Sequence, residues 1–331
     1  QVTNSYDESA SNKAVNVLAN IRLESGDMDG AKKLFTSLQQ KSGRRDVYAQ
    51  LSLANIEFET AMISEGRKKQ DHLNFALKIY KRVLQRDDSN IYAANGIGMV
   101  LAERGHLTYA RDIFTKVRDS AFDAPDPAIN LAKIQIQLKK YPAAIQLFQT
   151  CIQSFGPGDA GLHLSYLAAA YKVAGMNAEC LKVLQRAVRL FPEVVDHWYE
   201  LSSIMCIIAA DMYAKFSNVI SLDDKVMQLK RMKSYFASAL KYRQFYIKVG
   251  GVDIDEKEKA SAEQFVRKCT DHLKHLEDAL VTAMKSKEVS NQPATNLHRV
   301  CEAECMMLIL HQVVDTHTHT HTFYLHTYIH T

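Results

Sequence analysis

The chain has 331 residues, of which 47% are hydrophobic, and it contains only 13 glycines and 6 prolines. No segment alternates between apolar and polar residues for long enough to indicate a sheet, so the composition predicts an all-α protein. A formal net charge of +4 is too small to indicate a nucleic-acid-binding protein, and the longest apolar run, residues 201–213, is too short to cross a bilayer.

Three sets of residue positions recur along the chain with the same period of 34 residues. One set is small, one is aromatic and one is mainly aliphatic. The sets are Ala76, Ala110 and Ala144; Tyr80, Phe114 and Phe148; and Val83, Val117 and Cys151. A period of about 34 residues is typical of the tetratricopeptide repeat, a hairpin of two helices that stacks on its neighbours.

Residues 92–114 contain one such repeat in its most complete form. Gly98, Leu101, Gly105, Ala110 and Phe114 follow the order of small, large, turn, small and aromatic positions that the repeat requires. We expect Gly98 and Ala110 to let the two helices approach closely. Gly105 is expected in the turn, where a Cβ atom would disfavour a positive φ.

The predicted fold is an all-α tetratricopeptide-repeat (TPR) superhelical solenoid of about five to six helical hairpins, followed by a C-terminal helix. The second repeat carries an insert of 11 residues around residues 63–70, and the sixth has a long insert between its helices. In chain order, the solenoid is predicted over residues 1–250, with repeats near 12–44, 46–88, 91–123, 125–156, 161–193 and 195–248, then a helical segment over 255–288 and a tail over 289–331.

The tail alternates histidine with threonine between residues 315 and 331. Histidines two residues apart can share a metal ion. A CA-dinucleotide repeat in DNA also encodes this pattern, and we favour read-through of non-coding sequence over a metal site. The chain begins without methionine and is expected to be a fragment.

Few residues are arranged as catalysis or cofactor binding would require. Gly96-Ile97-Gly98 lacks the rest of a dinucleotide fingerprint, and residues 156–159 lack the lysine of a phosphate-binding loop. Isolated histidines such as His163 and His197 are more often structural. The sequence therefore predicts no enzyme, no cofactor and no metal site.

The six cysteines lack CxxC spacing, which argues against a metal or redox motif. Cys151, Cys180 and Cys206 fall on apolar helix positions, where a thiol acts as a small hydrophobic group. This usage indicates a reducing compartment, cytoplasm or nucleus. The remaining cysteines are Cys269, Cys301 and Cys305.

Four segments resemble a known family more specifically than the repeat pattern does. They are FALKIYKRVLQRD (75–87), IYAANGIG (91–98), GHLTYARDIFTKVRD (105–119) and VRKCTDHLKHLEDAL (266–280). They look like consecutive pieces of the TPR scaffold subunit of the RNA polymerase II-associated factor (PAF) transcription elongation complex. The resemblance covers roughly residues 13–288. Beyond it, the family's charged helical region and acidic, serine-rich end are replaced by the tail.

The resemblance implies a nuclear protein that travels with elongating RNA polymerase II on chromatin. Its implied role is to hold the other subunits of the complex together and thereby support histone ubiquitination and methylation. The implied partners are those subunits and, directly or indirectly, RNA polymerase II, with no small-molecule substrate, no membrane and no strong nucleic-acid signal.

The repeat frame by itself predicts a groove lined by the first helix of each hairpin, which suits an extended peptide or a partner's helix. An ordinary solvated helix face explains any single residue there equally well. Tyr92 and Met99 are expected on the helix surface rather than in the hairpin core. The candidate partner-binding residues are Tyr92, Asn95, Met99, Lys133, Gln137 and Lys172.

Two alternatives belong to other functional classes. A chaperone adaptor grips a carboxylate with Lys-Asn and Lys-Arg pairs spaced four residues apart. Asn95 and Met99 occupy the first pair of positions here, and Leu162 and Tyr166 occupy the second, so the clamp is absent. The chain could also be the TPR arm of a larger enzyme such as a glycosyltransferase.

Overall fold

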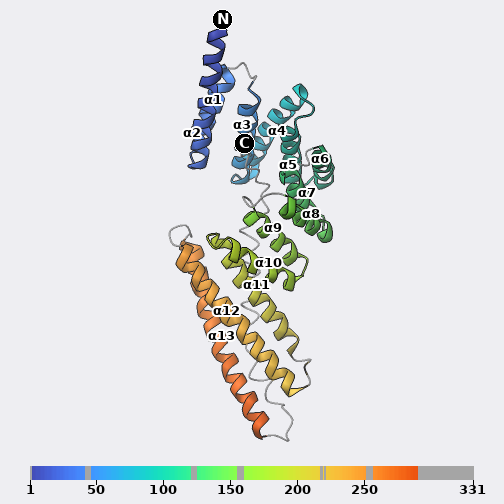
Figure 1. The fold of residues 1–331 in the computed structure, drawn as a ribbon, viewed down its shortest axis with the longest axis vertical. Coiled ribbons are helices and arrows are strands. Elements are labelled where there is room, and N and C mark those ends of the chain that lie inside the picture. Colours follow the sequence, from blue (N-terminus) through green and yellow to red (C-terminus); the bar gives the residue numbers. More distant parts are fainter. Residues whose placement is uncertain are drawn as a thin grey trace. The chain divides into compact units, whose positions relative to one another are not determined.

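The computed structural model describes residues 2–41, 46–120, 125–154, 160–216, 219, 221–250 and 256–289. Within these ranges the chain forms thirteen α-helices and no strand (Figure 1). The prediction of an all-α TPR fold is confirmed. The loop at 156–159 and the tail from residue 290, with Cys301 and Cys305, lie outside the described residues.

The chain divides into two compact units, one ending at Leu147 and the other beginning at Phe148. In the first unit, three helical hairpins follow one another, and each packs against the next. A further first helix packs against the third hairpin. The hairpins are α1 (Val2–Glu24) with α2 (Met28–Lys41), α3 (Val47–Met62) with α4 (Gly66–Arg86), and α5 (Ile91–Glu103) with α6 (Leu107–Ser120); the further helix is α7 (Pro125–Gln137).

The second unit begins within α8 (Tyr141–Ser154). Its later helices pack in sequence, each against the next, and α12 and α13 run side by side (Figure 1). They are α9 (Ala160–Val173), α10 (Asn177–Leu190), α11 (Val195–Ala214), α12 (Leu222–Gly250) and α13 (Glu256–Val289). The expectation of a single solenoid over residues 1–250 stays a prediction, as do the boundaries of the six repeats.

The apolar run of residues 201–213 lies in α11, where Leu201, Ile204 and Met205 are buried. It is therefore a repeat helix packed inside the protein, as its length predicts. None of the described helices combines the length and the hydropathy that crossing a membrane requires.

Two glycines of α5 bring neighbouring helices into close contact. A Cβ atom on Gly98 would lie 2.6 Å from Cε1 of Phe114, a fully buried ring of α6. A Cβ atom on Gly96 would overlap the buried ring of Tyr80 in α4. The close approach predicted at Gly98 is therefore present, and Gly96 provides a second one against the preceding hairpin.

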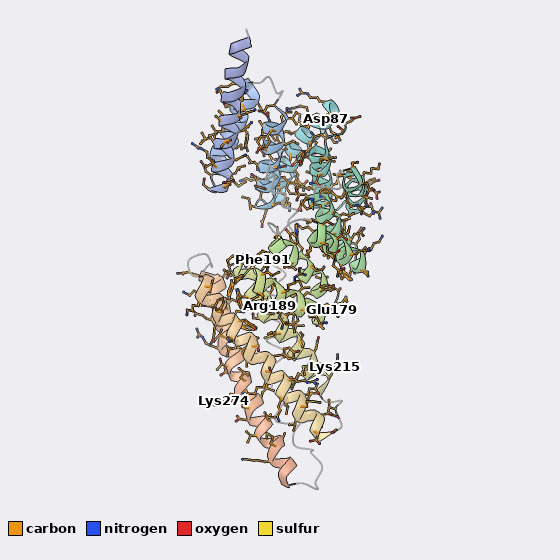
Figure 2. The ribbon with its side chains drawn as sticks, in the orientation of Figure 1. Asp87, Glu179, Arg189, Phe191, Lys215 and Lys274 are labelled. Carbon is orange, nitrogen blue, oxygen red and sulfur yellow. The ribbon has the colours of Figure 1, made fainter. Side chains whose placement is uncertain are left out.

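The connection between α4 and α5 is held by side chains that satisfy helix ends. Asp87, labelled in Figure 2, ends α4 and accepts a hydrogen bond from Ser89 Oγ at 2.6 Å. The hydrogen bonds from Ser89 and Asn90 lower the pKa of this carboxyl. Asn90 in turn caps α5 by accepting from the backbone N–H of Ala93 at 2.9 Å.

The turn after α5 is closed by two backbone hydrogen bonds. The N–H of Gly105 donates to Ala102 and that of His106 donates to Leu101, both at 2.9 Å, with Gly105 at a φ of 79°. The turn after α7 has the same two bonds, formed by the N–H groups of Lys139 and Lys140 at 2.8 Å. Lys139 has a φ of 59°, so a lysine occupies the backbone conformation that favours glycine.

Replacing Lys139 with glycine should raise the free energy of unfolding by about 0.5–1 kcal/mol, because the Cβ atom is strained at positive φ. Urea unfolding followed by circular dichroism measures the change. Lys140→Gly is the matched control, since Lys140 is equally exposed but has no positive φ, and it should be neutral or destabilising. A loss of stability in Lys139→Gly would contradict the assigned turn.

Candidate functional site

The first helices of neighbouring hairpins are joined by buried polar side chains. In the first unit, Asn130 of α7 donates its Nδ2 hydrogen bond to Asn95 Oδ1 of α5 at 3.2 Å. Asn95 Nδ2 donates in turn to Met99 Sδ at 3.8 Å. Asn95 and Asn130 are 5% and 1% exposed, so each amide depends on its partners for hydrogen bonds.

The predicted partner-binding residues of the first unit fall into two groups. Tyr92 is 43% exposed, and Gln137 is also exposed. Asn95, Met99 and Lys133 are only 5%, 2% and 1% exposed. The expectation that Met99 lies on the helix surface is therefore wrong. The physical reason is that α5 packs against α3, α4, α6 and α7, which leaves little of its surface uncovered.

Asn130 belongs to this polar bridge, although the sequence pattern did not single it out. It follows Asn95 by 35 residues, close to one repeat period, so the two asparagines occupy neighbouring positions on successive first helices. A search for polar residues that recur at the repeat period would have found the pair.

Lys133 is a buried cationic side chain in the same region. Burial lowers its pKa from the ordinary value of 10.5 to about 7, and Asp126 opposes this shift by favouring the charged ammonium. The folded protein therefore releases the proton of Lys133 at a lower pH than the unfolded chain does.

The stability of the protein should depend on pH through Lys133. Between about pH 7 and the unfolded pKa of 10.5, the unfolded chain binds a proton that the folded chain has released. The free energy of unfolding therefore rises with pH across this window, by at most about 1.4 kcal/mol per pH unit. Lys133→Met should remove this contribution, giving a flatter pH profile in urea unfolding measured at several pH values.

Lys140→Met is the control for this profile, because Lys140 is exposed and its replacement should leave the slope unchanged. If Lys133→Met and the original protein differed by the same free energy at every pH, the lowered pKa of Lys133 would be wrong.

In the second unit, the predicted residue Lys172 joins two first helices. Its Nζ lies 2.9 Å from Glu200 Oε2, which connects α9 to α11. Ser165 and His197 connect the same helices, with 2.8 Å between Oγ and Nε2. His197 is 1% exposed, and its burial lowers its pKa. Lys172 is thus already paired, and His197 lies inside the protein.

The described cysteines agree with the expectation of small hydrophobic groups. Cys151, Cys180, Cys206 and Cys269 are buried and form no disulfide. Burial raises the pKa of Cys180 to about 12, so its thiol is protonated at neutral pH. Among the described side chains, no group of three or more His, Cys, Asp or Glu residues could hold a metal ion.

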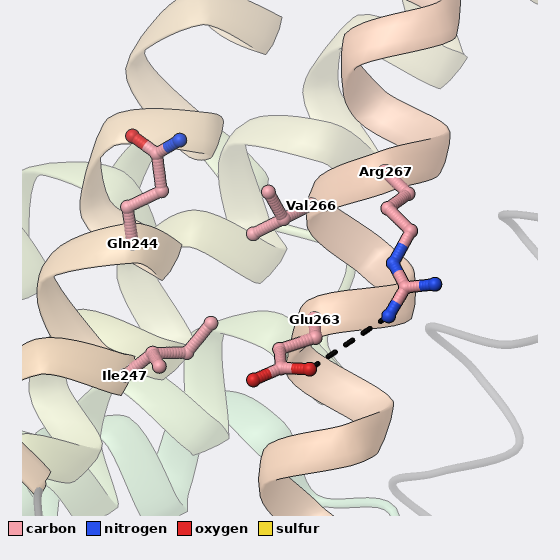
Figure 3. Close-up of a pocket in the computed structure, with 5 residues that line it drawn as sticks. All are labelled: Gln244, Ile247, Glu263, Val266 and Arg267. Atoms are coloured by element: carbon pink, nitrogen blue, oxygen red, sulfur yellow. Dashed lines mark ion pairs between the residues drawn. The ribbon is translucent and has the colours of Figure 1, made fainter.

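Two open grooves lie along α12 in the second unit. One has a volume of about 280 Å³ and is lined by Gln244 and Ile247 of α12 and by Glu263, Val266 and Arg267 of α13 (Figure 3). Within it, Arg267 Nη2 and Glu263 Oε2 form an ion pair at 3.8 Å, one helical turn apart. An exposed ion pair of this kind offers no distinctive chemistry.

The other groove has a volume of about 360 Å³ and lies between α11 and α12. Its lining residues are aromatic or carry a long polar side chain. They are Trp198, Lys241, Tyr242, Gln244, Phe245 and Lys248. The sequence analysis did not single out this groove, although Lys241, Phe245 and Lys248 have the spacing of one helix face.

The successive helical hairpins and the tight turns within them define a tetratricopeptide-repeat fold. A thermophilic TPR protein of Thermus thermophilus has a similar structure, with a TM-score of 0.50 and 16% sequence identity, over 58% of this chain and 98% of that chain. No protein-family model matches the chain.

Among curated proteins, the chain is 33% identical over 200 residues to "Protein CTR9 homolog" of Arabidopsis thaliana, a match that covers 58% of this chain and 18% of that protein. It is 34% identical over 146 residues to "RNA polymerase-associated protein CTR9" of Caenorhabditis elegans, a match that covers 43% of this chain and 13% of that protein. The resemblance drawn from the sequence is confirmed. The chain spans less than a fifth of the length of these relatives.

Proposed function

We propose that the chain is part of a protein-interaction scaffold of the RNA polymerase II-associated factor complex. The observation that carries this proposal is the similarity to CTR9 proteins, one of them named as RNA polymerase-associated. The TPR fold supports it, because stacked hairpins present extended surfaces for protein segments. In this proposal the protein acts in the nucleus, supporting transcription elongation and the linked histone modifications, and is not an enzyme.

The partners in this proposal are the other subunits of the complex and, through them or directly, RNA polymerase II. Within the first unit, Tyr92 and Gln137 are the candidate residues that a partner can reach. Tyr92 lies in the first turn of α5 and Gln137 at the end of α7. A bound segment that follows these first helices would contact both residues. The buried Asn95, Met99 and Lys133 would then act by aligning α5 with α7.

A chaperone adaptor is less well supported by the geometry. Carboxylate recognition needs several donors that converge on an accessible site. Asn95 and Met99 occupy the first pair of clamp positions and are both buried. At the second pair, Tyr166 stacks on Phe148 with 5.8 Å between the ring centroids, and Leu162 is an exposed aliphatic residue.

Truncating both accessible residues tests the scaffold proposal. The variant Tyr92→Ala/Gln137→Ala should recover the other PAF-complex subunits from nuclear extract at least about thirtyfold less well, since removing a binding hot spot costs about 2 kcal/mol or more. Its circular dichroism spectrum should be unchanged because both side chains are exposed. Mass spectrometry of the pulled-down proteins gives the readout.

Tyr109→Ala is the matched aromatic control, because Tyr109 lies on the second helix α6 and is 67% exposed. It should leave recovery unchanged, as should Lys68→Ala. Recovery of chaperones in place of the complex subunits would favour the adaptor. Co-purifying glycosyltransferase activity would favour the arm of an enzyme.

A further inference from the structure

Three aromatic side chains form a partly exposed cluster in the second unit, beside the turn that leads into α11. The ring centroid of Trp198 lies 4.4 Å from that of Phe245 and 5.7 Å from that of Tyr242. Trp198 Nε1 donates a hydrogen bond to the carbonyl oxygen of Pro192 at 2.9 Å, which fixes the orientation of the indole. Phe245 remains 39% exposed despite these contacts. The cluster is thus an ordered apolar surface that is open to solvent.

The groove beside this cluster is small. Its volume of about 360 Å³ is near the lower end of the range for ligand sites, roughly 300–1,000 Å³. It can accommodate one or two large side chains. Aromatic residues in such positions often dominate the binding energy of protein interfaces.

The helix that forms one wall of the groove has a strongly uneven charge distribution. Residues 226–249 of α12 contain lysine and arginine but no aspartate or glutamate. Lys233 is paired with Glu277 of α13 at 2.9 Å. Arg243 is buried, donates to Ser202 and Ser203, and stacks on Tyr199.

Lys241 and Lys248 differ from these two cations because both are exposed and both line the groove. They are seven residues apart, which places them two turns apart on the same face of α12. Neither forms an ion pair with any side chain that the structure describes. Two ammonium groups that have no ion-pair partner among the described side chains therefore flank the aromatic cluster.

We propose that this groove binds an acidic segment of a partner protein. An aromatic or large aliphatic side chain of the segment would pack against Trp198 and Phe245, and its carboxylates would lie beside Lys241 and Lys248. The apolar lining requires a large apolar side chain in the segment. The two ammonium groups favour carboxylates on either side of it. This surface goes beyond the proposed function, because it does not depend on which complex the chain serves.

A single-stranded nucleic acid is a less suitable occupant. Bases stack on aromatic rings that present an open face. Here the plane of Trp198 is tilted by 47° to Phe245 and by 45° to Tyr242, and both of these rings pack against Trp198. The groove also offers two cations rather than a continuous basic track. A side chain that inserts among the rings fits this arrangement better than a stacked base.

Trp198 provides a direct assay, because it is the only tryptophan in the chain. The probe is an unlabelled peptide of sequence Asp-Glu-Glu-Phe-Asp-Glu-Glu, titrated into the full chain at low ionic strength while tryptophan emission is recorded. We expect a saturable change in emission. The same peptide with serine in place of phenylalanine, and a peptide with lysine in place of every acidic residue, should each bind at least about tenfold more weakly.

The double charge reversal Lys241→Glu/Lys248→Glu should also weaken binding of the acidic peptide by at least about tenfold, and Phe245→Ala should do so independently of charge. The matched control is Lys182→Glu/Arg189→Glu, a reversal of two exposed cations with the same seven-residue spacing on α10. This control should bind normally. Circular dichroism checks that each variant is folded.

Four results would overturn the proposal. The first is an emission spectrum that the acidic peptide does not change. The second is equal binding of the serine or lysine peptide. The third is unchanged binding of the acidic peptide to the folded Lys241→Glu/Lys248→Glu or Phe245→Ala variant. The fourth is tighter binding of an oligothymidylate than of the acidic peptide, which would assign the groove to nucleic acid.

Discussion

The ring of Phe114 occupies the space where a side chain on α5 would lie if residue 98 were not glycine. Tyr80 occupies the corresponding space at Gly96 on another side of the same helix. The rings of Phe114 in α6 and Tyr80 in α4 pack directly on the backbone of α5. This helix therefore approaches both neighbours more closely than a helix of larger residues could. A glycine inside a helix costs about 1 kcal/mol relative to alanine, and this close packing offsets that cost. This spacing determines how α5 packs between α4 and α6.

Close packing of first helices has an electrostatic consequence, because it buries polar side chains that would otherwise be solvated. Burial removes water from these polar groups, and Asn95 and Asn130 replace it by hydrogen bonding to each other. For Lys133, burial instead lowers the pKa, so that its ammonium loses the proton more readily. In the second unit, Lys172 and Glu200 neutralise each other between α9 and α11. Asn95, Asn130 and Lys133 are thus buried between stacked helices, whereas Tyr92 and Gln137, at helix ends, remain accessible.

Sequence periodicity predicted the hairpins, the Gly98 contact and the Gly105 turn, because each depends on residues within one repeat. It could not predict the burial of Met99 and Lys133, since that depends on how the adjacent hairpins cover α5 and α7. Sequence periodicity also could not predict the turn at Lys139, because a lysine gives no local signal for a positive φ. The aromatic groove could not be predicted either, because Trp198 and Phe245 lie on different helices. Their contact follows from the packing of α11 on α12. A periodic pattern therefore locates surfaces within a repeat better than surfaces built between helices.

A double-mutant cycle between Gly98 and Phe114 tests the central claim that a ring packed on a bare helix backbone sets the spacing. Gly98→Ala should destabilise the protein by about 1–3 kcal/mol through overpacking, despite the better helix propensity of alanine. In a Phe114→Leu background the smaller side chain leaves room for the new methyl group, so the same change should cost at least about 1 kcal/mol less. Urea unfolding of the four proteins gives this coupling energy. Additive effects within about 0.5 kcal/mol, or a Gly98→Ala variant that is more stable than the original protein, would contradict the account.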